Sequence, residues 1–116
     1  MKNRITPLTK PTLDSNEILE IKKVIDSGWL TQGPKVAIFE KKFSKFIGNK
    51  YSIAVSNCTA ALHLALKVAG IKKNDEVITV SHSYIATANS IRYCGAIPVF
   101  IDIDIETYNI DHNQIE

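Results

Sequence analysis

The sequence predicts an α/β fold built around a mostly parallel sheet covered by helices, and two observations indicate it. First, short β-type runs alternate with helical patterns along the second half of the chain, giving strands over 51–55, 76–80 and 97–101. Second, the last of these runs, Ile-Pro-Val-Phe-Ile, is nearly continuously apolar, as expected of a strand covered on both faces. Two βαβ units in succession favour parallel strands joined by right-handed crossovers.

Two amphipathic helices are expected before the first strand. One begins at the capping residues around Asp14, repeats apolar side chains at helical spacing and ends at Gly28. The other runs from about Lys35 to Ile47, and a glycine follows it as a stop. Residues 29–34 form the loop between the two helices, and residues 1–14 are expected to be an extended lead-in.

The first strand leads directly into the central helix. Ser56 and Asn57 are helix-capping residues, and the Ala/Leu-rich run behind them ends at Gly70. This run is apolar around most of its circumference, which is typical of a helix packed on more than one side. A further helix is expected from Tyr84 to Tyr93, and Asp111 is expected to cap one more.

Composition and charge exclude several classes of function. The 116 residues amount to one domain, 45% of them are hydrophobic, and the net charge of +2 from mixed signs gives no case for nucleic acid. Membrane-length apolar runs and an apolar leader are absent from the sequence, so we expect a cytoplasmic protein that binds no membrane. Two distant cysteines and three scattered histidines indicate neither a disulfide scaffold nor a metal site.

The start of the central helix is the main candidate for a binding site. Ligands of parallel α/β sheets bind beyond the carboxyl ends of the strands, here the loops 56–59, 81–84 and 102–104. The free amides of a helix start attract anions. At this start the small Cys58–Thr59 step would let a phosphate approach the backbone, and the Thr59 hydroxyl adds a donor. An ordinary capped core helix would have the same residues, so both interpretations stay open.

Tyr84 lies at the end of the neighbouring loop and could place an aromatic ring above the possible phosphate-binding site at Cys58–Thr59. That combination suits a flat, phosphorylated, heteroaromatic cofactor, whereas a half-buried tyrosine that only packs is the alternative. The sequence contains no G-x-G-x-x-G after a strand, no G-x-x-x-x-G-K-[ST] and no G-x-S-x-G. Nucleotide binding by a Rossmann or P-loop motif and hydrolysis at a nucleophile elbow therefore have little support.

Five motifs, in order and spacing, strongly resemble the DegT/DnrJ/EryC1/StrS family of sugar aminotransferases. They are GWLTQGP at 28–34, AVSNCTAALHLAL at 54–66, SYIATANS at 83–90, GAIPVF at 95–100, and Asp104 followed by YNID at 108–111. The resemblance implies a fold type I (aspartate aminotransferase-like) enzyme that uses pyridoxal 5'-phosphate (PLP). Residues 1–116 would then be the N-terminal portion of the PLP-binding large domain, with two helices followed by βαβαβ.

The resemblance also implies roles for individual residues. Cys58 and Thr59 would hold the cofactor phosphate through backbone amides and the Thr59 hydroxyl, and Tyr84 would stack on the pyridine ring. Thr31 and Gln32 would contact the substrate. Family members often have Gly or Ala at the position of Cys58. We expect this small side chain to preserve the phosphate-binding site and to be packed and unreactive. The alternative is a reactive thiol at a helix start.

The activity implied by the resemblance is transfer of an amino group, from a donor such as glutamate, to a keto sugar linked to a nucleotide diphosphate. Such enzymes are homodimers that serve surface polysaccharide or amino-sugar biosynthesis. The family's Schiff-base lysine and its acidic partner for the pyridine nitrogen follow the matched motifs, so we assign no catalytic residue here and expect the lysine beyond Glu116. The 116 residues alone are therefore predicted to be inactive. The alternative is a non-catalytic module of the same fold that binds phosphate or a partner subunit.

Overall fold

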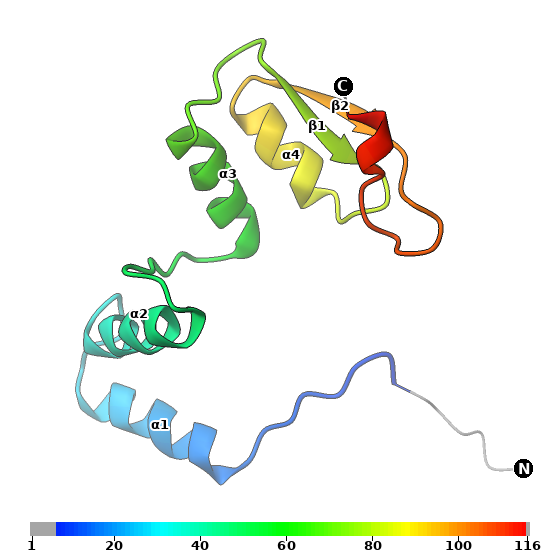
Figure 1. Cartoon of the computed structure of the whole chain (residues 1–116). Helices are drawn as coiled ribbons and strands as arrows, with labels where there is room; N and C mark the ends of the chain where they lie inside the picture. Colours follow the sequence, from blue (N-terminus) through cyan, green and yellow to red (C-terminus); the bar gives the residue numbers. More distant parts are fainter. Residues whose placement is uncertain (1–6, 116) are drawn as a thin grey trace, which may run out of the picture. The chain divides into compact units, whose positions relative to one another are not determined.

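The computed structural model describes residues 7–115 (Figure 1). It divides the chain after Ala54 into two compact units, which are described separately below. Residues 1–6 of the expected extended lead-in lie outside the described part, and residues 7–14 have no helix or strand.

The first unit contains the two expected helices, α1 (Ser15–Asp26) and α2 (Pro34–Ile47). A capping box begins α1: the Asn16 amide donates to the Asp14 carboxylate at 2.6 Å, and Glu17 accepts from the Asp14 amide at 2.7 Å. Gly48 ends α2 in the left-handed conformation, with φ of 82°. Both helices predicted from the sequence are confirmed.

The strand predicted over residues 51–55 is not formed. This segment contains no strand in the structure and follows α2, to which two hydrogen bonds tie it. The Glu40 carboxylate accepts from the Ala54 amide at 2.8 Å, and the Ser44 hydroxyl donates to that of Ser52 at 2.8 Å. The local sequence favours a strand, but a strand forms only beside another, and none of those described lies against this segment.

The second unit contains the parallel sheet. Its strands, β1 (Glu76–Val80) and β2 (Ile97–Ile101), pair in register from Glu76 opposite Ile97 to Val80 opposite Ile101. The helix α4 (Ala86–Tyr93) connects them, so this is one βαβ unit (Figure 1). The central helix α3 (Cys58–Val68) precedes the unit, and a short 3₁₀ helix, η1 (His112–Gln114), follows it. Both strands match the predicted ranges.

The core of the second unit lies where α3, α4 and β1 meet. Ile91, Cys94 and Ala96 are buried, and Leu66, Ile71 and Val77 pack against them. α4 contacts both strands and α3, so it is the element around which this unit packs.

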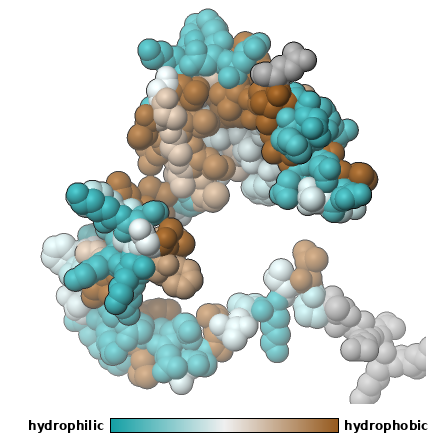
Figure 2. Space-filling view, in the orientation of Figure 1, coloured by the Kyte–Doolittle hydropathy of each residue, from teal (hydrophilic) through white to brown (hydrophobic). Residues whose placement is uncertain are grey.

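Two expectations about burial are wrong for the described residues. The central helix α3 has no buried residue, because α4 is its main neighbour and one helix covers only one side of another. Strand β2 is not covered on both faces, since Ile97 and Phe100 remain 43% and 53% exposed. Figure 2 accordingly shows hydrophobic residues on the surface of this unit.

The loop after β1 lies near the turn that follows β2. The His82 ring, after β1, lies 5.9 Å from the Tyr108 ring in the turn after β2. An antiparallel bridge between Ile103 and Ile110 closes that turn. Asp111 caps as predicted, accepting from the Asn113 amide at 3.0 Å, although only a single 3₁₀ turn follows. Within residues 7–115, none of the helices is long and apolar enough to cross a membrane.

Candidate cofactor and substrate sites

The start of α3 presents free backbone donors. The Asn57 side chain caps the helix by accepting from the Ala60 amide at 2.9 Å. The backbone carbonyl of Asn57 accepts from the Ala61 amide. Among the residues that the structure describes, the amides of Cys58 and Thr59 donate to no acceptor. Two N–H groups at the positive end of the helix dipole are therefore available to an anion.

A hollow of about 400 Å³ lies beside this helix start. It is lined by Asn57, Thr59, Ala60, His63 and Tyr93. The His63 Nε2 atom is buried without a hydrogen-bond partner in the described part of the chain, and the ring meets Tyr93 edge-on at 5.7 Å. His63 follows Thr59 by four residues, so the two share one helix face. That spacing could have identified His63 from the sequence.

Cys58 and Tyr84 are both exposed in the structure. Cys58 is exposed, so its thiol is not packed among the described residues, and whether it is inert or reactive stays a prediction. Tyr84 is 80% exposed and thus is not a half-buried packing residue. Its loop is shaped by the Thr87 amide, which donates to the Tyr84 carbonyl at 3.0 Å. Tyr84 does not line the hollow beside Thr59, so the placement of its ring above the phosphate-binding site stays a prediction.

The first unit has a pocket of its own, of about 460 Å³, formed by α1, α2 and the loop that joins them. Its walls are mainly apolar, and they include Lys23, Val24, Ser27, Trp29, Thr31, Gly33, Pro34, Lys35, Val36 and Ile38. Thr31 is thus placed in a pocket wall. Gln32 contributes its carbonyl, which accepts from the Trp29 indole N–H at 2.8 Å.

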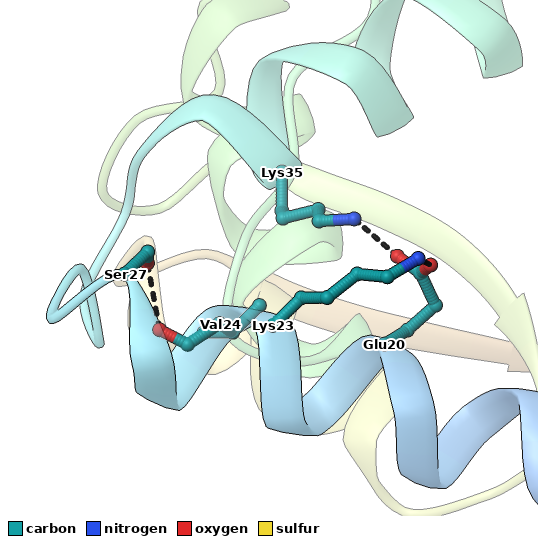
Figure 3. Close-up of polar contacts among 5 residues, drawn as sticks. All are labelled: Glu20, Lys23, Val24, Ser27 and Lys35. Atoms are coloured by element: carbon teal, nitrogen blue, oxygen red, sulfur yellow. Dashed lines mark hydrogen bonds and ion pairs between the residues drawn. The ribbon is translucent and has the colours of Figure 1, made fainter.

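Positive charge lies at this pocket. Glu20 accepts from Lys23 at 2.6 Å and also from Lys35 (Figure 3). The ion pair between Glu20 and Lys35 joins α1 to α2. The hydrogen bond from Lys23, followed by that from Lys35, lowers the pKa of the Glu20 carboxyl from 4.5 to about 2. Two ammonium groups thus face one carboxylate, which leaves a net positive charge that suits an anionic ligand.

Comparison with known proteins identifies the family. The model of the DegT/DnrJ/EryC1/StrS aminotransferase family matches residues 11–116. The chain belongs to this family. It is 49% identical over 115 residues to the spore coat polysaccharide biosynthesis protein SpsC of Bacillus subtilis, covering 99% of this chain and 30% of that protein. The chain thus spans about 30% of the length of the curated relatives it matches.

Solved structures of DegT/DnrJ/EryC1/StrS relatives share the fold. Spr1654 of Streptococcus pneumoniae, named as a candidate sugar aminotransferase and solved in a PLP form, superposes with a TM-score of 0.88 at 33% identity. It matches 93% of this chain and 28% of its own. A GDP-4-keto-6-deoxymannose-3-dehydratase structure gives a TM-score of 0.84 at 35% identity, over 90% of this chain and 29% of its own. The small parallel sheet and its helices match the opening part of the PLP-dependent aminotransferase fold.

Proposed function

We propose that this chain is part of a PLP-dependent aminotransferase that moves an amino group from glutamate to a keto sugar linked to a nucleotide diphosphate. The product would serve surface polysaccharide or amino-sugar biosynthesis, and the enzyme would be a cytoplasmic homodimer. Family membership and the likeness to a protein of spore coat polysaccharide biosynthesis support this proposal.

The start of α3 is the observation that most favours PLP. A phosphate monoester needs several hydrogen-bond donors, and here two free amides, of Cys58 and Thr59, accompany the Thr59 hydroxyl. The unpartnered His63 Nε2 lies in the same hollow as Thr59. The chemistry of these groups fits a phosphate, and we propose that they hold that of PLP.

The remaining roles follow from exposure and charge. The exposed Tyr84 ring would stack on the pyridine ring of PLP, which when bound supplies the electron sink for amino transfer. Thr31 and the Gln32 backbone would contact the substrate, and the net positive charge of Lys23 and Lys35 against Glu20 would favour its diphosphate. No catalytic lysine is assigned within these 116 residues, which alone would not turn over substrate.

The test uses the whole protein that contains this sequence, incubated with PLP, glutamate and a panel of nucleotide-linked keto sugars. Mass spectrometry of the products should show replacement of a keto oxygen by an amino group, with 2-oxoglutarate formed in equal amount. The same assay on the isolated 116 residues should give no amino sugar. PLP binding without turnover of any keto sugar by the whole protein would instead support the non-catalytic module, and turnover by the isolated chain would refute its predicted inactivity.

A further inference from the structure

In the loop between α1 and α2, the Trp29 indole fills the space where a side chain of residue 33 would lie, an arrangement called the interlock of Trp29 with Gly33. From this geometry we propose that Trp29 is a positioning residue, which holds Thr31 in the wall of the pocket in the first unit. The proposal deepens the substrate role given above to this loop and rests on that proposed function. Three observations lead to it: the identity of the residue at 33, the bonds of Trp29, and the walls of the pocket.

Gly33 is the N-cap of α2, a position that accepts glycine but does not require it, and its backbone conformation does not require glycine either. Its φ of −167° is extended, which any residue adopts, and the helix has no side-chain cap. Ser, Thr, Asn or Asp would therefore be favoured at this position. A Cβ atom on residue 33 would lie 1.8 Å from the Trp29 Nε1 atom and 2.0 Å from its Cδ1 atom. The indole ring occupies the space of a side chain, and this explains the glycine.

Trp29 is held at both of its N–H groups. Its backbone amide donates to the Ser27 hydroxyl at 3.2 Å, and that hydroxyl donates to the Val24 carbonyl of α1 at 2.7 Å (Figure 3). Its indole N–H donates to the Gln32 carbonyl at 2.8 Å, one residue before α2 is capped. The side chain therefore bridges the loop from its α1 end to its α2 end, with Thr31 inside the bridged turn.

The bridge forms part of the pocket wall. Trp29, Thr31 and Gly33 line the same pocket, and Trp29 is 57% exposed. A wall fixed before the ligand arrives spares the loss of loop entropy on binding, so it strengthens binding. Loss of the interlock should raise KM for the nucleotide-linked sugar while kcat changes little, because substrate and transition state lose the same binding energy.

The first test compares Trp29→Phe with the whole wild-type enzyme. Phenylalanine keeps an aromatic ring but lacks the N–H donor, so KM for the sugar substrate should rise about three- to tenfold, the effect of one lost hydrogen bond. We expect kcat to stay within about twofold and bound PLP to be unchanged. An unchanged KM, or a fall confined to kcat, would overturn the positioning role.

The second test is a double-mutant cycle on Trp29→Ala and Gly33→Ala, read both in KM and in urea unfolding. Each single variant should raise KM and destabilise the protein. The double variant should have a KM no higher, and a stability to urea no lower, than the more strongly affected single variant. The reason is that alanine at 29 frees the space that alanine at 33 needs. Additive effects would overturn the interlock. If the wild-type protein aminates no sugar, the proposed function fails, while the unfolding cycle still decides on the interlock.

Discussion

At the scale of single residues, the polar contacts follow local sequence rules, whereas the interlock does not. The capping roles near Asp14 and of Asp111 were predictable, because a cap depends only on the next few residues. The interlock of Trp29 with Gly33 was not predictable, because the two residues meet only once the loop has folded. In addition, glycine before proline is equally typical of a plain helix start. Likewise, the exposure of Cys58 depends on neighbours in space rather than in sequence.

Glu20 gives a pH-dependent prediction at this scale. Its ion pairs with Lys23 and Lys35 lower the pKa of its carboxyl from 4.5 to about 2, so the folded state favours the charged form. The resulting stabilisation is fully present above pH 4.5 and is lost as the pH falls toward 2. It should be modest, because both ion pairs are exposed and screened by salt.

The Glu20 prediction is checked by urea unfolding of wild type and Glu20→Gln between pH 2 and 7 in low salt. The variant should be less stable than wild type at neutral pH, and the difference should disappear at the acid end. The matched control is Glu76→Gln, which removes the charge of an exposed glutamate for which the structure gives no ion pair among the described residues. A stability difference independent of pH would contradict the ion-pair account.

At the scale of elements, the sequence predicts helices and strands where the local pattern suffices and fails where a partner is needed. The strands at 76–80 and 97–101 match their predicted ranges, since each has the other beside it. Residues 51–55 have an equally good strand pattern, but Glu40 and Ser44 of α2 bind this segment instead. Predicted burial fails for the same reason, because apolar composition indicates which faces could be covered and not which ones are.

The packing around α4 gives a prediction at this scale. Ile91, which is 3% exposed, lies in the core between α4 and its neighbours. Ile91→Ala should lower the free energy of unfolding by about 2–5 kcal/mol, because it removes buried methyl groups and leaves a cavity. Urea unfolding followed by circular dichroism measures this. The control Ile105→Ala, at a 76% exposed position, should cost far less, and equal losses for both variants would contradict the proposed core.

At the scale of the whole molecule, two units carry the two candidate sites. The first contains the pocket with Thr31 in its wall, and the second contains the α3 start with Cys58 and Thr59 and the loop of Tyr84. The fold class and the family were both predictable from the sequence, because the motifs at the strand ends and helix starts are local. The division into two units was not, because it depends on how many contacts join distant segments.

The central claim is that the start of α3 holds the phosphate of PLP, and cofactor binding by the whole protein tests it most directly. PLP affinity should be measured by absorbance for wild type, Thr59→Val and the control Thr9→Val, which makes the same change at an exposed position outside the helices and strands. We expect Thr59→Val to weaken PLP binding about tenfold or more, the effect of a lost hydrogen bond to a charged group, and Thr9→Val to bind as wild type does. Equal affinity of all three proteins for PLP would contradict the claim.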